Sequence, residues 1–184
     1  MTVLGAAALA GCGGAQQDAH EPNANFTVSV VRASFPTTQS LAEHSQLQIT
    51  VRNSGSSTVP NIAVTVNGLN YRDAQPGLQD PNRPVWIIDQ EPVGGVTADT
   101  NTWALGSLAP GATTTFDWHL TAEQAGEHLV SYRVAAGLNG LAKAVDASGA
   151  PASGAFSVDI GSAPPQAHVN PATGVVEPGP APLR

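Results

Sequence analysis

The sequence predicts an all-β protein, an antiparallel β-sandwich of about seven strands with a long irregular insertion. Apolar and polar residues alternate over residues 47–51 and again over 62–66, and the turn-forming cluster Asn-Ser-Gly-Ser-Ser at 53–57 separates these runs. Period-two alternation bounded by Gly and Ser is typical of half-buried antiparallel strands. The inward-facing sets can be buried only against a second sheet, so a sandwich follows.

Length and composition fit one domain with flanking segments. The chain has 184 residues, of which 19 are Gly and 15 are Pro, and this favours turns over long helices. A domain of about 140–150 residues buries roughly 68–70% of its unfolded surface, so its core needs no disulfide or metal.

The remaining strands follow along the chain by the same alternation. A polar connection, 34–45, precedes the two runs named above, and a short helical turn or a loop is expected at 121–127. The segments 141–145 and 155–160 are expected to form a hairpin, because Gly and Pro lie between them. The other expected strands are 26–31, 103–108, 113–120 and 128–134.

The N-terminus carries a signal for export and lipidation. Residues 1–11 are expected to be a signal peptide, because a short apolar run leads to Leu-Ala-Gly-Cys at 9–12, which resembles a bacterial lipobox. That resemblance implies a diacylglycerol on Cys12 and an exported protein, anchored in the cell membrane and facing the extracellular side or the periplasm. No positive charge precedes the apolar run, so we expect the true start to lie upstream. The alternative is an Ala-rich N-terminus with an incidental cysteine.

Two flanking segments are expected to have little structure. Residues 12–25 are small and polar and are expected to be a flexible tether between the anchor and a domain at 26–161. Residues 162–184 contain six prolines and are expected to be an extended or disordered tail. A spacer is the simpler interpretation of the tail, and docking on a partner is the alternative.

The charge balance argues against nucleic-acid binding. The net charge is −7, and the seven Lys and Arg residues are scattered without a basic run. A phosphate backbone needs clustered cations, and the same argument disfavours electrostatic binding to anionic lipids.

The residues that bind metals or cofactors are sparse. Cys12 is the one cysteine, so an intrachain disulfide and a thiolate zinc site are excluded. His119 and His128, if on adjacent strands near Asp117, could bind zinc or copper, but the ligands are too few for a defined site. Scattered acidic residues in the insertion lack calcium-loop spacing. No catalytic motif occurs, and we expect no cofactor, no metal and no catalytic residue.

The insertion at 67–101 is the best candidate for a functional surface. Long segments without regular structure are frequently binding loops. Trp86 offers a ring for a sugar or a partner, whereas Trp103 and Trp118 are expected in the core or at its rim. The alternative is that the apolar island 85–88 pins the insertion onto the sandwich. The candidate ligand- or partner-binding residues are Tyr71, Asp80, Arg83 and Trp86.

The strand motifs together resemble the CARDB-type domain, the cell adhesion related domain found in bacteria, which has an immunoglobulin-like fold. They are Leu-x-Ile-x-Val-x-Asn-x-Gly at 47–55, the Val-Pro-Asn-Ile and Val-x-Val that follow, Leu-Gly-Ser-Leu-Ala-Pro-Gly at 105–111, and the alternation at 116–118 and 126–134. The resemblance covers about 26–136 with the insertion in between. In such a sandwich Gly55 and Gly111 turn corners, and Asn53 satisfies local backbone groups. The resemblance implies adhesion or scaffolding rather than catalysis.

The sequence therefore predicts a non-enzymatic, lipid-anchored envelope protein that acts as an adhesion, scaffold or protein-interaction module. Its expected partners are the membrane, through the lipid on Cys12, and an envelope protein or a glycan. One alternative is a glycan- or small-ligand-binding module that uses 67–101. Another is an accessory subunit of an envelope enzyme that docks through its tail.

Overall fold

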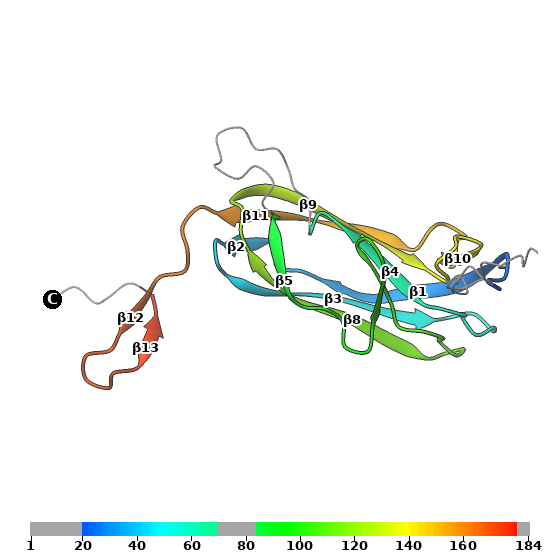
Figure 1. Ribbon diagram of the computed structural model, residues 1–184, viewed down its shortest axis with the longest axis horizontal. Coiled ribbons are helices and arrows are strands. Elements are labelled where there is room, and N and C mark those ends of the chain that lie inside the picture. The colour runs from blue at the N-terminus through cyan, green and yellow to red at the C-terminus, as the bar shows by residue number, and fades with distance from the viewer. Residues whose placement is uncertain (1–19, 70–83, 180–184) are drawn as a thin grey trace, which may run out of the picture.

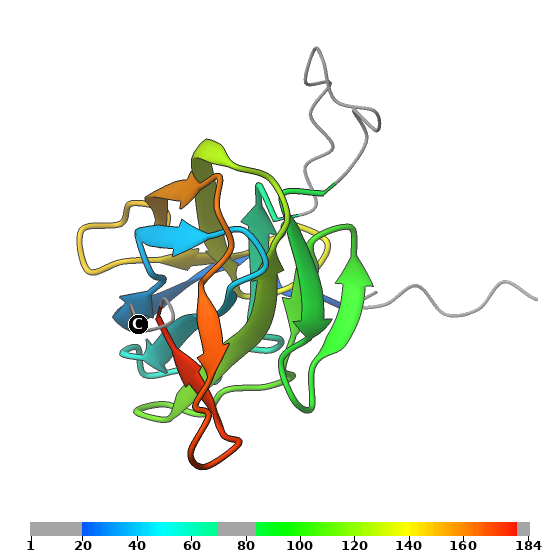
Figure 2. The same ribbon diagram turned by 90° about the vertical axis from the view of Figure 1, so that its left-hand side faces the viewer.

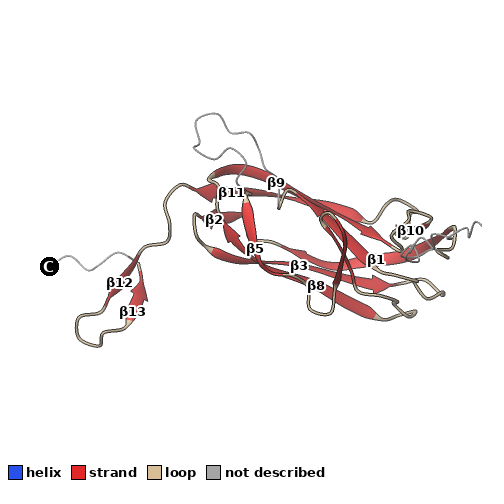
Figure 3. Ribbon diagram, viewed as in Figure 1, coloured by secondary structure: helices blue, strands red, loops and turns tan. Residues whose placement is uncertain are grey.

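Two β-sheets pack face to face in the computed structural model, which describes residues 20–69 and 84–179 (Figures 1 and 2). One sheet has the strand order β10-β1-β3-β8-β5, and the other has the order β2-β11-β9-β4-β7-β6. The first sheet contains β1 (Ala24–Ser34), β3 (His44–Asn53), β5 (Trp86–Gln90), β8 (Thr113–Ala122) and β10 (Ala142–Val145). The second contains β2 (Thr38–Ser40), β4 (Ala63–Asn67), β6 (Val96–Asp99), β7 (Thr102–Ala104), β9 (Gly126–Ala135) and β11 (Ser153–Gly161). The described part of the chain contains no helix (Figure 3).

The predicted all-β sandwich is confirmed, and β3 lies at the centre of its sheet. It pairs antiparallel with β1 and with β8, and every second side chain points inward. Leu47, Ile49 and Val51 are fully buried, and they meet the equally buried Val64 and Val66 of β4 in the same core. The two sheets also touch through Trp103 and Trp118, whose rings meet edge to face at 5.3 Å. Both tryptophans are buried, as expected.

Asn53 ends the inward-facing row of β3 as a buried polar group. Its Nδ2 donates to the carbonyls of Ser57, at 2.9 Å, and of Leu108, at 2.8 Å. Its Oδ1 accepts a hydrogen bond from the Gly55 amide at 3.0 Å. The predicted role of Asn53 in satisfying backbone groups is therefore confirmed, and it joins the 53–57 turn to the segment before β8.

The sandwich has more strands than the expected seven. The described residues of the insertion are not irregular throughout, because β5 and β6 lie within 67–101 and extend one sheet each. The connection at 121–127 contains no helical turn, since β8 continues to Ala122 and β9 begins at Gly126. Not every pair is antiparallel, as β10 lies parallel to β1 and β2 lies parallel to β11.

The expected hairpin of 141–145 with 155–160 is wrong. β10 joins β1 in the first sheet, whereas β11 pairs with β9 in the second. The Gly and Pro residues do reverse the chain, but only the Val145–Pro151 bridge forms before the strands diverge. Ala142 and Ala144 instead turn their small side chains into the core beside β1.

Both flanking segments are more ordered than expected. Glu21, within the expected tether, is buried, and β1 begins at Ala24. Within the tail, β12 (Ala167–Val169) and β13 (Val176–Pro178) form a two-stranded hairpin, where an ion pair joins His168 to Glu177 at 3.7 Å. The hairpin projects from one end of the sandwich, and β10 lies at the other end (Figure 1). Over residues 20–69 and 84–179, no helix has the length and apolarity needed to cross a membrane.

We predict that Asn53→Ala destabilises the fold by about 2–4 kcal/mol, because it removes the three hydrogen bonds that this buried side chain makes to the backbone. Urea unfolding followed by tryptophan fluorescence measures the change. Ser56→Ala, at an exposed position of the same turn, is the matched control and should shift stability by no more than about 0.5 kcal/mol. Equal effects of the two substitutions would contradict the role assigned to Asn53.

Candidate functional site

The predicted ligand-binding residues are only partly covered by the structure. Cys12, Tyr71, Asp80 and Arg83 lie outside the described residues. Trp86 is described and has no exposed surface, so its ring offers no face to a ligand. The prediction of Trp86 as a binding residue is therefore wrong for this structure, because the apolar island turns the indole inward.

Trp86 closes one end of the core. Its Nε1 donates to Oε1 of the buried Gln39 at 2.8 Å, and its ring packs against Phe35 at 5.4 Å. The Gln39 Nε2 donates in turn to the Pro36 carbonyl at 3.0 Å. Burial of the ring with its N–H paired is the usual state of a core tryptophan. The alternative reading of the island, that it pins the insertion onto the sandwich, fits this geometry.

The histidines that could have shared a metal lie apart. His119 is on β8 in the first sheet and His128 is on β9 in the second, so they are not on adjacent strands. The His128 ring meets Trp86 at 5.6 Å, and its Nε2 lies 3.0 Å from the Gln124 carbonyl. In the part of the chain that the structure covers, no three His, Cys, Asp or Glu residues gather as a metal site.

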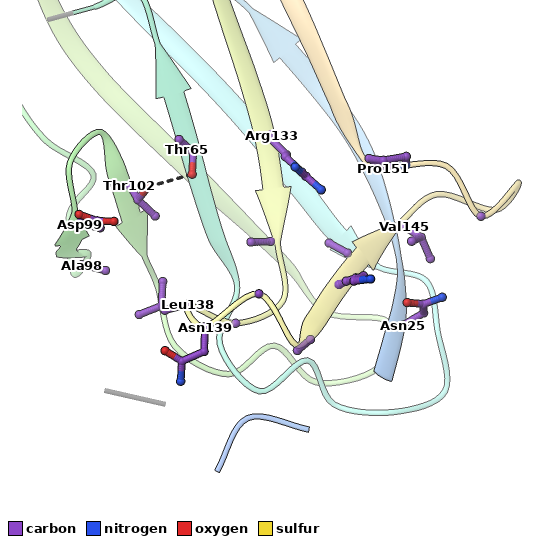
Figure 4. Close-up of a pocket in the computed structure, with 17 residues that line it drawn as sticks. Asn25, Thr65, Ala98, Asp99, Thr102, Arg133, Leu138, Asn139, Val145 and Pro151 are labelled. Atoms are coloured by element: carbon purple, nitrogen blue, oxygen red, sulfur yellow. Dashed lines mark hydrogen bonds between the residues drawn. The ribbon is translucent and has the colours of Figure 1, made fainter. Parts of the chain in front are cut away.

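A groove of about 890 Å³ lies on the outer side of the second sheet, toward the end where β10 is found (Figure 4). Its floor is formed by β4 and the end of β9. The loop after β9, together with β10 and the turn that follows it, forms one wall, and the end of β6 with the start of β7 forms the other. Ala98 and Asp99 of the insertion contribute to this second wall, so the expected functional segment does reach the groove.

One row of polar side chains crosses four strands, from the wall at β6 and β7 over the floor at β4 and β9. Asp99 lies opposite Thr102, Thr102 opposite Thr65, and Thr65 opposite Arg133. Directly opposed residues on neighbouring strands share a face of the sheet. The hydroxyls of Thr65 and Thr102 are 2.8 Å apart, which joins the middle of the row (Figure 4). The row thus begins at a carboxylate and ends at a guanidinium.

Two cations line the part of the groove where β9 and β10 come together. Arg133 comes from β9, and Lys143, the one lysine of the chain, comes from β10. Both residues are exposed, and neither side chain forms a hydrogen bond or an ion pair with any described residue. Charged groups without a protein partner are available to a ligand. No His, Cys, Ser or Glu lines the groove among the described residues, and the hydroxyls of Thr65 and Thr102 make no hydrogen bond to a described carboxylate.

A buried carboxylate fixes the wall of the groove from behind. Glu21 accepts hydrogen bonds from the backbone amides of Asn139 and Ala142, which flank the loop before β10. Its carboxyl group also packs directly on Gly137, where an added Cβ would lie 2.3 Å from the Glu21 Cδ. Glu21, three residues before β1, therefore sets the position of the loop that lines the groove.

The turn after β10 is held by a second carboxylate. Asp146 Oδ1 accepts hydrogen bonds from the Ser148 hydroxyl, at 2.6 Å, and from the Ser148 and Ala150 amides. The hydrogen bond from the Ser148 hydroxyl, together with those from the backbone, lowers the pKa of Asp146, because these donors favour the charged carboxylate. The turn therefore holds its shape best when Asp146 is ionised.

The sequence did not single out these residues. Asp99, Thr102, Thr65 and Arg133 each occupy an outward position of a strand, where polar residues are ordinary. The one usable signal was the placement of the positive charges. The chain has seven Lys and Arg residues, and two of them, Arg133 and Lys143, are ten residues apart in the sequence.

No protein-family model matches the chain, and no curated protein matches its sequence. Similar solved structures include the CARDB domain of a Pyrococcus furiosus protein in complex with di-metal ions, at 15% identity and a TM-score of 0.44, over 74% of this chain and 93% of that chain. A segment of Escherichia coli α2-macroglobulin is similar over 82% of this chain and 21% of that chain, at 15% identity and a TM-score of 0.45. The CARDB domain is the domain type that the sequence motifs resemble. The β-sandwich is shown by the strand pairing of this chain, and these likenesses add no function to it.

We predict that Glu21 and Gly137 are energetically coupled. Glu21→Ala should destabilise the protein by about 2–4 kcal/mol, since the buried amide of Ala142 and the partly buried amide of Asn139 lose this charged acceptor. Gly137→Ala should also destabilise it, because the new methyl group displaces the carboxylate. In the Glu21→Ala background the same Gly137→Ala change should cost about 1 kcal/mol less than in the native chain. A double-mutant cycle by urea unfolding measures this, and additive effects would contradict the packing described.

Proposed function

We propose that this chain is a non-enzymatic, lipid-anchored protein of the bacterial cell envelope, whose β-sandwich acts as an adhesion, scaffold or protein-interaction module. The lipobox at 9–12 supports the anchor, and the open polar groove supports binding. The CARDB-type motifs of the sequence are consistent with this role.

The observation that carries the proposal is the composition of the groove. It offers hydroxyls, and charges without a partner among the described residues, which can hold a ligand. Covalent catalysis requires a nucleophile within hydrogen-bond reach of a base, and in the described residues no hydrogen bond joins the Thr65 or Thr102 hydroxyl to a carboxylate. The geometry thus favours recognition over turnover.

The proposed anchor also gives the domain an orientation. Nine residue steps separate Cys12 from Glu21, and a fully extended chain of that length spans roughly 30 Å. Because Glu21 is fixed beside the groove, a lipid on Cys12 would keep the groove within that distance of the membrane. The β12–β13 hairpin lies at the opposite end of the sandwich and would point away from the membrane (Figure 1).

A second candidate is an accessory role in which the tail docks on an envelope partner. Val169, Val175 and Val176 of the hairpin segment are 61%, 57% and 66% exposed. A two-stranded hairpin has little stability of its own in water, and exposed apolar side chains favour association. These valines are the observation in favour of this role.

We predict that Cys12→Ala abolishes metabolic labelling with an alkynyl fatty acid and releases the protein from the membrane fraction, because no thiol remains for the lipid. Gly13→Ala, at the neighbouring position, is the control and should leave labelling unchanged. Labelling that persists in Cys12→Ala would refute the proposed anchor.

We also predict that a photo-crosslinking residue in place of Val176 forms a discrete adduct with an envelope protein in cells. A residue of the same kind at Thr115, on the exposed face of β8, should form no discrete adduct. The same pattern at both positions would count against docking through the tail.

A further inference from the structure

We infer that the groove binds a short extended peptide with free termini, whose carboxylate lies at Arg133 and Lys143 and whose ammonium group lies at Asp99. This inference rests on the proposed function as a binding module and names the ligand class of its groove. The charges, the spacing of the polar row and the small side chains of the floor all support it.

The row sets the length of the ligand. Asp99 and Arg133 are separated by three strand-to-strand steps, because β7 and β4 lie between β6 and β9. Adjacent strands are about 4.8 Å apart, so the backbones of the two residues are about 14 Å apart. An extended peptide advances about 3.3 Å per residue, so about four residues match this span.

The cationic end suits a carboxylate. A guanidinium binds a carboxylate with two parallel hydrogen bonds. An ammonium group beside it adds a second positive charge on a flexible side chain, which can adjust to the position of the ligand. Arg133 reaches this end from the second sheet and Lys143 from the first. Neither cation has a protein partner among the residues that the structure describes.

The opposite end suits an ammonium group. Asp99 is exposed, and one of its carboxylate oxygens, Oδ1, accepts a hydrogen bond from the Thr100 amide at 2.7 Å. That bond orients the carboxylate, and its other oxygen makes no hydrogen bond with any described residue. A ligand with a positive charge at this end and a negative charge at the other would pair with both ends of the row.

The middle of the groove fits a peptide backbone. The hydroxyls of Thr65 and Thr102 can each donate and accept hydrogen bonds, as amide groups require. Gly140 in the wall, where an added Cβ would meet nothing within 4 Å, leaves room for close approach of a second backbone. No aromatic ring lines the groove in the described residues, so a sugar would find no stacking face.

The overall charge of the chain selects against polyanions. A net charge of −7 repels nucleic acids and acidic polymers over long distances, whereas a zwitterion carries no net charge to be repelled. The local pair of cations can then act on the carboxylate at short range.

Isothermal titration calorimetry of the full chain, produced without export so that Cys12 stays unmodified, tests this inference. The probes are tetra-alanine, N-acetyl-tetra-alanine and tetra-alanine amide. We expect tetra-alanine to bind, and each capped form to bind about tenfold more weakly, because each cap removes one charge pair. Arg133→Gln should reduce the preference over the amide, which Lys143 alone then supports, and Asp99→Asn should abolish the preference over the acetylated form.

Two matched controls remove equivalent charges elsewhere. Arg52→Gln and Asp159→Asn replace exposed residues outside the groove and should keep both preferences. The substituted side chains are all exposed, and far-UV circular dichroism checks that each variant is folded.

Capped peptides that bind as well as tetra-alanine, or no heat of binding at about 5 mM tetra-alanine, would overturn the inference. Fatty-acid labelling at Cys12 does not depend on this outcome, so failure of the peptide site and failure of the anchor are distinguishable.

Discussion

The burial of alternate side chains of β3 between two sheets is the constraint on which this structure depends. Leu47, Ile49 and Val51 are fully buried, and β1 and β8 are paired to both edges of the strand that carries them. A slip of one residue would turn all three side chains outward and bring polar ones into the core, so the register is strongly specified. The same register carries Asn53 inward, where its amide must be paired, and the 53–57 turn supplies the partners.

Burial in the core also determines which side chains remain on the surface to contact a ligand. Trp86, Trp103 and Trp118 are all buried, so none of the three tryptophans remains on the surface for a ligand. The indole N–H groups of Trp103 and Trp118 have no hydrogen-bond partner within the described structure, which costs about 1–3 kcal/mol for each. Burial of the large rings and their edge-to-face contact offsets that cost. Any binding surface of this chain is therefore built without a tryptophan ring.

Local patterns predicted the centre of the fold well and its edges poorly. The alternation at 47–51 and at 113–120 is complete within one strand, and both strands are where the sequence placed them. The pairing of β10 with β1 has no such local signal, since its two inward residues are alanines and the nearby Gly and Pro indicate a hairpin. The groove is even harder to predict from the sequence. Its polar row takes one ordinary residue from each of four strands, and only the register of distant segments brings them into line.

Glu21 joins the two parts of the molecule that matter most for the proposed function. It stands between the expected anchor and the first strand, and its carboxylate holds the loop that forms a wall of the groove. Its two hydrogen bonds reach this loop and Ala142, the first residue of β10, whose side chain is buried in the core. A change at Glu21 is therefore expected to disturb the wall of the groove and to lower the stability of the sandwich through one side chain.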